Sequence, residues 1–420
     1  MNNTTSEHKT VWDVVVIGGG PSGMMAAGKA ASRGKSVLLL EKNTELGKKL
    51  LITGGGRCNI TNNKPDTRTL LSKYKGNDQF LFSAFSQWSV ADTLTFFNTR
   101  GVPTKEENEG RIFPVSNTSQ SVYDVLYAYM KEHGVQIHKS SIVSGIKKQK
   151  EGEGFLITTK SGNTVSAHKV IIATGGTSRP ETGSTGDGFA WLKKLQHTVI
   201  ENDFALVPIS LSDLWTKKLS GVTLSDIKLT TFQNDKKQDS YKGKLLFTHV
   251  GISGPTVLGM SKDVGELLKY GDVVISLDLF PSKDEAKVKR ELQTILIAES
   301  NKKLKNVLPL LVPSSLVAPL LSQTGIDGET FSHSVRSEDR TTLSHAIKNI
   351  PLHVKSLLGK EKAIVSSGGI PLTEIDMKTM ESNIVPGLYL TGDVLNIDRP
   401  SGGYSLQLCW TTGFVAGSNC

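Results

Sequence analysis

Cysteine is scarce in this sequence, with only Cys58, Cys409 and Cys420 among 420 residues. Three scattered cysteines exclude a disulfide framework and a cysteine-rich zinc cluster, so we expect a cytoplasmic protein without a bound metal. No apolar run reaches the ~18 residues that cross a bilayer. Residues 1–10 are polar and lack the basic-then-apolar order of a secretory signal, so we expect no membrane partner.

A strong excess of one charge sign and an RNA-binding sequence motif are also missing. Forty-nine basic residues stand against 40 acidic ones, which gives a formal net charge of +9. Spread over the whole chain, this balance attracts phosphate-rich partners only modestly. Lysines are denser between residues 217 and 244 and between residues 283 and 305. These lysines either form an ordinary solvated surface or bind RNA phosphates, and both interpretations stay open.

Glycine, by contrast, is abundant, with 41 residues, many of them at the ends of predicted strands. The β-branched run 14–17 predicts a buried parallel strand. Gly18-x-Gly20-x-x-Gly23 follows it and opens an alanine-rich helix. A second strand over 37–40 ends in Glu41. This order is a complete βαβ unit and predicts dinucleotide binding.

Each part of this unit has a physical role. Gly18 permits the turn, Gly20 lets a pyrophosphate approach the backbone, and Gly23 lets helix and strand pack closely. The start of the helix offers unsatisfied N–H groups and a positive dipole end to the phosphates. Glu41 is placed to accept hydrogen bonds from the ribose hydroxyls of an adenosine.

The fingerprint alone fits FAD and NAD equally, but the rest of the chain favours FAD. A strand ending in Ala173-Thr174-Gly175-Gly176 and a terminal strand ending in Gly392-Asp393 suit a long ligand that lies along the sheet. A helix predicted from about Tyr404 points its N-terminus at the pyrimidine edge of an isoalloxazine, where a reduced flavin is negative. A second GxGxxG is missing, so we expect NAD(P)H as a transient reductant.

Two further glycine-rich stretches invite a ligand role. ITGGGRCNIT, residues 52–61, follows Glu41 in the same predicted domain, so we expect Gly54 to Gly56, with Gly55 and Gly56 as contacts, along the FAD backbone. Cys58 and Asn59 would then lie near the isoalloxazine, while Arg57 holds an anion or makes a surface salt bridge. TGSTGDG, residues 182–188, has no lysine and is no P-loop. It either contacts phosphate through its backbone or is only a turn.

The whole pattern predicts an α/β protein with a discontinuous Rossmann-like domain. Residues 1–200 and 371–420 form the FAD-binding domain, residues 201–281 with 350–370 a β-rich insertion, and residues 282–349 a helical insertion. The aromatic side chains of the helical stretch 70–98 are interpreted as core, namely Phe80, Phe82, Phe85, Trp88, Phe96 and Phe97.

The sequence resembles the YhiN/BaiN-like flavoproteins, also named the aminoacetone-oxidase-family FAD-binding enzymes. The resemblance is carried, in order, by VIGGGPSGMMAA, LGKKLLITGGGRCNITN, GRIFPVS, ATGGTSRPETGSTGDG, LLFTHVGISGP and PGLYLTGDVLNIDRPSGGYSLQ. It implies an FAD domain with a β-barrel-like and a helical insertion. Family sequences usually have G-E-V where this chain has Gly392-Asp393-Val394, so the acid here is one carbon shorter. They also have D-G-x-x-G-G-Y-N at 398–405, where Arg399 replaces the loop Gly and Ser405 replaces the final Asn.

The resemblance implies reduction of a polarised C=C bond, with hydride from the flavin to one carbon and a proton to its neighbour. Our first expectation is conversion of uridine to dihydrouridine in 23S rRNA. Our second is reduction of a small unsaturated molecule, a 3-dehydro-bile-acid-like enone, or an amine oxidase activity. The third is a non-catalytic, flavin-dependent RNA-binding or ribosome factor.

Three residues are candidates for acid chemistry. Cys58 donates a proton if Arg57 lowers its pKa from the free-thiol value of ~8.5, or is only a small residue packed beneath the flavin. His249 acts as an acid, orients substrate, or is structural. Tyr404 donates to substrate, or caps a helix and packs on the ring. The expected FAD contacts are Gly18, Gly20, Pro21, Ser22, Gly23, Glu41, Lys42, Gly55, Gly56, Arg57, Cys58, Asn59, Ala173, Thr174, Gly175, Gly176, Gly392, Asp393, Gly403, Tyr404 and Ser405.

Overall fold

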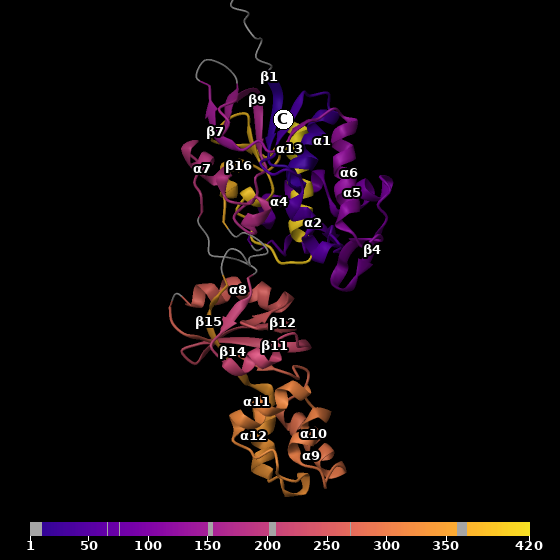
Figure 1. The fold of residues 1–420 in the computed structure, drawn as a ribbon, viewed down its shortest axis with the longest axis vertical. Helices are drawn as coiled ribbons and strands as arrows, with labels where there is room; N and C mark the ends of the chain where they lie inside the picture. Colours follow the sequence, from indigo (N-terminus) through magenta and orange to yellow (C-terminus); the bar gives the residue numbers. More distant parts are fainter. Residues whose placement is uncertain are drawn as a thin grey trace, which may run out of the picture. The chain divides into compact units, whose positions relative to one another are not determined.

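The chain divides into two compact units in a computed structural model that describes residues 11–64, 66–74, 76–149, 154–200, 207–268, 270–358 and 368–420. Unit 1 comprises residues 1–203 and 364–420, and unit 2 comprises residues 204–363 (Figure 1). Both ends of the chain therefore belong to unit 1. The polar segment 1–10 and the expected boundary at residue 201 lie outside the described residues.

A mixed sheet of nine described strands forms the centre of unit 1. Its parallel part has the order β18-β9-β1-β2-β6, and Val14, Val15 and Val16 of β1 are fully buried, as a parallel strand covered on both faces requires. These strands are β1 (Val11–Ile17), β2 (Val37–Leu40), β6 (Gln136–His138), β9 (Thr164–Ile172) and β18 (Leu388–Leu390). The antiparallel strands are β7 (Val143–Lys148), β8 (Phe155–Thr159), β16 (Ile375–Asp376) and β17 (Glu381–Ser382).

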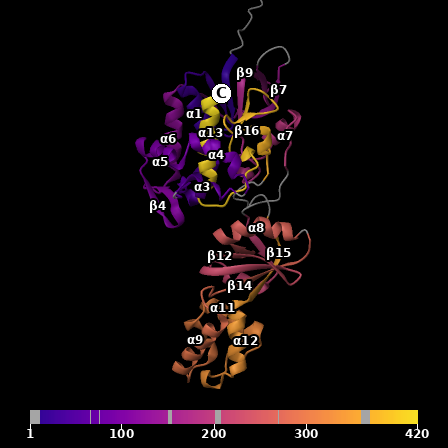
Figure 2. The same ribbon diagram turned by 180° about the vertical axis from the view of Figure 1, so that it is seen from behind.

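The first and last helices of unit 1 lie side by side in both ribbon views (Figures 1 and 2). They are α1 (Pro21–Ser32), which follows the GxGxxG turn, and α13 (Tyr404–Asn419) at the end of the chain. A Cβ atom built at Gly413 would lie 2.5 Å from the carbonyl oxygen of Ser22. Only a residue without a side chain permits this close crossing, which attaches the C-terminal helix to the dinucleotide-binding helix.

The helical stretch 70–98 is broken into short helices and not continuous. The capping box of Ser89 and Asp92 starts a new helix there, because each side chain accepts a hydrogen bond from the other residue's backbone N–H. Phe82 is 52 % exposed and Phe80 38 %, so the interpretation of these two rings as core is wrong, whereas the other four aromatic side chains are buried. The helices are α3 (Thr67–Leu71), α4 (Asp78–Gln87) and α5 (Val90–Thr99).

A small sheet and three further helices complete unit 1. The sheet has the order β3-β5-β4 and carries Arg111 at the start of its central strand. Its strands are β3 (Thr61–Asn62), β4 (Thr104–Glu107) and β5 (Arg111–Pro114). The helices are α2 (Lys48–Leu51), α6 (Ser119–Glu132) and α7 (Asp187–Lys194).

Unit 2 consists of a closed antiparallel barrel and a group of helices (Figure 1). One hydrophobic cluster runs through both parts, from Phe247 and Ile275 in the barrel to Leu292 and Leu316 in the helices. The barrel strands are β10 (Ile209–Leu211), β11 (Thr223–Gln233), β12 (Lys236–Thr248), β13 (Gly251–Ser253), β14 (Val273–Asp278) and β15 (Ile350–Leu357). The helices are α8 (Pro255–Leu268), α9 (Glu285–Ala298), α10 (Leu304–Val307), α11 (Ser314–Thr324) and α12 (Ser337–Lys348).

This architecture confirms the predicted α/β class, with a discontinuous Rossmann-like part and barrel and helical segments inserted in it. The barrel and the helices share one hydrophobic cluster within a single compact unit. Their treatment as two domains, with boundaries at residues 281 and 349, therefore stays a proposal.

Candidate functional site

A groove of about 540 Å³ lies in unit 1 at the carboxyl ends of the parallel strands. Gly18 follows β1, Glu41 follows β2, Ala173 follows β9, and Asp393 and Ser141 lie shortly after β18 and β6; all of them line the groove. These five strands are neighbours in one sheet. At ~4.8 Å between strands, the groove crosses roughly 19 Å of sheet edge. Ligands of open α/β sheets bind at this edge.

The turn after β1 is shaped for close approach of backbone and ligand. Gly18 has φ +107°, and a Cβ atom there would lie 2.5 Å from the carbonyl oxygen of Ala173. A Cβ atom at Gly23 would lie 1.9 Å from the carbonyl oxygen of Gly18. At Gly20 the same atom would meet no protein atom within 4 Å. The first and third glycines therefore pack the turn, and the second faces open space.

Helix α1 begins directly at this turn, and no side chain caps its N-terminus. Gly20 occupies the cap position, and Pro21 is the first helical residue. The early N–H groups of the helix are therefore available to an anion at the groove, where the helix dipole is positive.

Glu41 is fixed at the end of β2 by two backbone groups. The N–H of Gly19 donates to its Oε2 atom at 2.7 Å, and the N–H of Asn43 donates to its Oε1 atom at 2.7 Å. The residue is buried, yet it lines the groove. Each carboxylate oxygen keeps a second lone pair, so Glu41 can still accept hydrogen bonds from ligand hydroxyls.

The 182–188 stretch forms one wall of the groove and packs on the residues after β2. The Nζ atom of Lys42 donates to Thr185 at 2.5 Å and to the carboxylate of Asp187 at 2.8 Å. The ammonium of Lys42 is therefore used to hold this wall. Four of its residues line the groove, namely Thr182, Gly183, Ser184 and Asp187.

Only part of the ITGGGRCNIT segment lines the groove, namely Ile52, Thr53, Gly54, Gly55 and Asn59. Arg57 instead forms an ion pair with Glu107 and lies 4.2 Å over the ring of Phe113. This arrangement matches the surface salt bridge among the two roles considered for Arg57.

Cys58 is fully buried and has φ +62°. Burial raises the pKa of its thiol to about 12, and a hydrogen bond with Thr53 opposes this only in part. The acid role considered for Cys58 required Arg57 to lower this pKa, whereas burial raises it and the Arg57 guanidinium pairs with Glu107. The thiol stays protonated at neutral pH.

Three charged side chains, those of Lys49, Asp393 and Arg399, meet at the groove, which Lys49 and Asp393 line. Arg399 forms an ion pair with the Oδ1 atom of Asp393, and the Nζ atom of Lys49 lies 3.7 Å from Oδ2. Burial alone would raise the pKa of Asp393, but the positive charges of Arg399 and Lys49 outweigh it and hold the pKa below its ordinary value. Sequence reasoning selected Asp393 but gave no role to either cation, although both lie within the quoted family motifs.

The start of α13 faces the groove with Gly403 and Ser405, whereas the Tyr404 side chain is buried behind it. A Cβ atom at Gly403 would lie 2.3 Å from the carbonyl group of Thr61, so the backbone is closely packed there. The ring of Tyr404 contacts that of Tyr74 edge to face, and burial raises the pKa of its phenol to about 12. Tyr404 thus packs on another aromatic side chain of the protein, and Gly403 holds the cap position of α13, so the roles considered for Tyr404 at the flavin stay predictions.

His249 belongs to unit 2, where it is exposed between β12 and β13, and its part in chemistry stays a prediction. Of the expected FAD contacts, those that do not line the groove are Gly23, Gly56, Arg57, Cys58, Gly176, Gly392 and Tyr404. The groove also has lining residues that sequence reasoning missed, among them Lys48, Lys49, Ile142, Arg179, Trp191, Ser401, Gly402, Leu406 and Cys409.

None of the helices in the described part of the chain is long and apolar enough to cross a bilayer. Nor do three or more His, Cys, Asp or Glu side chains gather there in a way that would hold a metal ion.

Known proteins match this chain over nearly its full length. The model of the family described as HI0933-like protein Rossmann domain matches residues 12–419. A 3-dehydro-bile acid delta(4,6)-reductase of Clostridium scindens is 32 % identical over 406 residues, 96 % of this chain and 97 % of the relative. A ribosomal RNA dihydrouridine synthase of Escherichia coli is 29 % identical and covers 96 % of both chains. These matches confirm the resemblance stated from the motifs.

The same fold occurs in solved structures of lower identity. A 3-ketosteroid-delta4-(5alpha)-dehydrogenase from Rhodococcus jostii RHA1 aligns with a TM-score of 0.53 at 15 % identity, over 100 % of this chain and 98 % of that chain. At this identity the likeness shows the fold alone.

Proposed function

This chain belongs to the HI0933-like family of Rossmann-domain proteins, and we propose that it is an FAD-dependent oxidoreductase whose flavin lies in the groove of unit 1. The observation that carries this proposal is the groove itself, which crosses the ends of five neighbouring strands. A mononucleotide would fill only part of such a length, whereas an extended dinucleotide suits it.

The residues present fit an FAD. The open space at Gly20 and the uncapped start of α1 suit a pyrophosphate, and Glu41 suits the adenosine ribose. Asn59, Gly403 and Ser405 line the groove on the side of α13 and would face the flavin portion. When bound, FAD supplies hydride transfer. The chain positions the cofactor. The thiol of Cys58 and the phenol of Tyr404 are buried next to groove-lining residues and do not line the groove themselves.

NAD(P)H as the transient donor is part of the proposal. The described part of unit 1 has one GxGxxG turn and one large groove, which the flavin would occupy. A nicotinamide would then reach the flavin only by visiting the substrate side of the groove. The cytoplasmic location expected from the cysteine content likewise stays a proposal.

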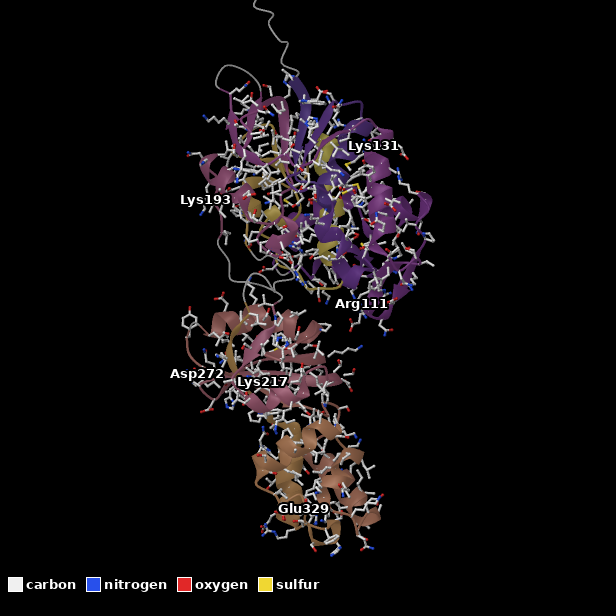
Figure 3. All side chains as sticks on the ribbon, in the orientation of Figure 1. Arg111, Lys131, Lys193, Lys217, Asp272 and Glu329 are labelled. Atoms are coloured by element: carbon white, nitrogen blue, oxygen red, sulfur yellow. The ribbon has the colours of Figure 1, made fainter. Side chains whose placement is uncertain are left out.

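For the substrate, we propose first a uridine of 23S rRNA, reduced to dihydrouridine. The Escherichia coli relative that covers 96 % of both chains is named for this reaction. Lysines are exposed in the barrel region, on the 3-10 helix Leu214–Leu219 before β11 and along β12, where they could contact RNA phosphates. They are Lys217, Lys218, Lys236, Lys237, Lys242 and Lys244. Lys217 of this group is labelled in Figure 3.

The second candidate is a small enone, such as a 3-dehydro bile acid. It is favoured by the Clostridium scindens relative, whose identity of 32 % slightly exceeds that of the dihydrouridine synthase. The amine oxidase and the non-catalytic RNA-binding factor stay predictions. If either of these two alternatives holds, the protein reduces neither the uridine of rRNA nor the enone.

One experiment separates these candidates. The flavin-loaded protein is incubated with NADH or NADPH and either unmodified 23S rRNA or a 3-oxo-Δ4 bile acid, and products are measured by mass spectrometry. We expect dihydrouridine in the rRNA, and binding whose affinity falls steeply with salt. Turnover of the bile acid with unchanged rRNA would establish the second candidate and overturn the first.

A further inference from the structure

Lys49, Asp393 and Arg399 form a cluster with one positive charge in excess, in which Arg399 is buried and Lys49 and Asp393 are half-buried. The side chain of Arg399 is 1 % exposed and donates to the carbonyl oxygen of Ile397 at 2.6 Å and to the Oγ atom of Ser405 at 3.0 Å. It also forms the ion pair with Asp393. The single carboxylate is therefore already matched by a cation in direct contact.

The ammonium of Lys49, in contrast, has no carboxylate of its own in close contact among the described residues. Its Nζ atom donates to the hydroxyl of Ser178 at 2.7 Å but lies 3.7 Å from Asp393, which Arg399 shares. Burial lowers the pKa of Lys49, and the charge of Asp393 restores it only in part. Withdrawing an ion from water is unfavourable unless a counter-charge is near. A second anion beside Lys49 would remove this penalty.

The position of the cluster indicates which anion this is. Lys49 and Asp393 both line the groove. A Cβ atom built at Gly392 would lie 2.8 Å from the Oγ atom of Ser22, the second residue of α1. On the other side, the N–H of Gly47 donates to the carbonyl oxygen of Gly19 at 2.9 Å. Both segments that carry the cluster are thus attached to the dinucleotide turn and to the uncapped start of α1.

We propose that Lys49 binds the pyrophosphate of the dinucleotide in the groove, and that Asp393 and Arg399 are positioning residues that hold its ammonium there. This inference rests on the proposed function, because it requires a dinucleotide in the groove. It assigns the negatively charged middle of the ligand to a lysine outside the GxGxxG motif.

A proton is coupled to this binding. In the free protein a fraction of Lys49 is neutral at alkaline pH, since its pKa is depressed below the ordinary 10.5. The charged groups that face Lys49 are Asp393 and Arg399, and the thiol of Cys409 is the third titratable neighbour. A bound pyrophosphate favours the ammonium, so binding takes up a proton there. Affinity for the dinucleotide then falls as pH rises through the pKa of Lys49 in the free protein.

The test uses the full chain stripped of flavin, with dissociation constants from isothermal titration at pH 7 and pH 9. The ligands are FAD, ADP-ribose, which keeps the pyrophosphate without the isoalloxazine, and riboflavin, which lacks phosphate. Lys49→Met is expected to bind FAD and ADP-ribose about 10- to 100-fold more weakly, the range of a charge-assisted hydrogen bond, and riboflavin unchanged. Lys49→Arg restores most of the affinity because it restores the charge.

Lys29→Met is the matched control. Lys29 is also a half-buried lysine of unit 1 whose pKa burial lowers, but it lies over Phe414 and does not line the groove. Its substitution is expected to leave all three dissociation constants unchanged. If Lys49→Met does not fold, the wild-type protein provides the test. Its proton uptake on binding ADP-ribose is then measured by titration in buffers of different ionisation enthalpy.

The outcomes are distinct. If wild type binds FAD but Lys49→Met loses less than threefold in affinity for both pyrophosphate ligands, or loses affinity only for riboflavin and FAD, the inference is overturned. Absence of proton uptake by the wild type at pH 9, where the coupling requires it, also overturns it. If wild type binds neither FAD nor ADP-ribose, it is the proposed function that fails.

Discussion

The backbone N–H of Gly19 donates a hydrogen bond to the Oε2 atom of Glu41 at 2.7 Å. The acid at the end of β2 and the glycine turn after β1 therefore fix each other, in addition to any contact with a ligand. Because the N–H of Asn43 uses the other oxygen, both carboxylate oxygens must act as acceptors. This requirement makes the site sensitive to a change of a single atom.

Glu41→Gln replaces one acceptor oxygen with an NH₂ group that would face a backbone N–H. We expect the free energy of unfolding to fall by about 1–3 kcal/mol, the cost of an unsatisfied buried group, and FAD to bind at least about tenfold more weakly. Urea unfolding and flavin titration measure the two effects. Glu45→Gln is the control, since Glu45 is an exposed residue paired with Lys139. Equal behaviour of the two variants would contradict this role of Glu41.

A second fixed relationship joins the segment after α7 to the C-terminal part of the sheet. The Nδ1 atom of His197 lies 2.7 Å from Glu374, and its Nε2 atom lies 2.9 Å from the Oγ atom of Ser382. The N–H groups of Ile384 and Val385 donate to this same hydroxyl. The hydroxyl therefore donates to Nε2, and Nδ1 carries the proton donated to Glu374. Since Ser382 is buried, the cluster stabilises the fold and does not act on a ligand.

This cluster makes part of the stability dependent on acid pH. Burial would raise the pKa of Glu374, but hydrogen bonds from Thr198 and His197 outweigh it and lower the pKa. A carboxylate with a depressed pKa contributes stability above its unfolded pKa of ~4.3 and loses that contribution as pH falls through the folded value. Glu374→Gln should therefore reduce stability at pH 7 and flatten its loss below pH ~5, as followed by thermal unfolding. Glu181→Gln, at an exposed residue, should keep the wild-type slope.

Burial of Cys58 predicts an unreactive thiol. With its pKa raised to about 12, Cys58 remains protonated across the neutral and mildly alkaline range, where a free thiol near ~8.5 ionises. Iodoacetamide at pH 8 should leave Cys58 unmodified in the folded protein and alkylate it after unfolding in urea, as peptide mass spectrometry would show. Because Cys58 does not line the groove, Cys58→Ala should keep single-turnover reduction of substrate. A loss of 100-fold or more in that rate would restore the acid role considered from the sequence.

The βαβ unit could be predicted from the sequence because its parts are local. Strand, glycine turn, helix and acid follow one another within residues 11–41, and each has its own signature. The discontinuous domain and its barrel and helical insertions could also be predicted, from changes of periodicity along the chain and from the family motifs.

The contacts that escaped prediction join residues distant in sequence. Lys49 and Arg399 are separated by 350 positions, and their segments meet because both are attached to the turn after β1 and the start of α1. The orientation of Arg57 is set by Glu107 on a neighbouring strand, which a glycine-rich motif does not reveal. Phe80 and Phe82 flank Leu81 on α4, whose buried face is Leu81, Ala84 and Phe85, so both rings lie beside that face and are partly exposed. Such outcomes depend on tertiary packing, which overrides local pattern.

The central claim is that a dinucleotide flavin lies against the turn after β1, and Gly20 tests it most directly. Gly20 has φ −78°, an ordinary value, and a Cβ atom there would meet no protein atom within 4 Å. Gly20→Val should therefore fold with nearly unchanged thermal stability. Gly18→Ala, in contrast, should lower stability markedly, because its φ is +107° and its Cβ would approach Ala173.

The decisive measurement is the FAD dissociation constant of flavin-stripped Gly20→Val beside that of the wild type. The account predicts one FAD per wild-type chain, weaker binding of FMN, and a loss of at least about 100-fold in FAD affinity in the variant, since the valine side chain occupies the space of the pyrophosphate. Unchanged FAD affinity in a folded Gly20→Val protein would contradict the account.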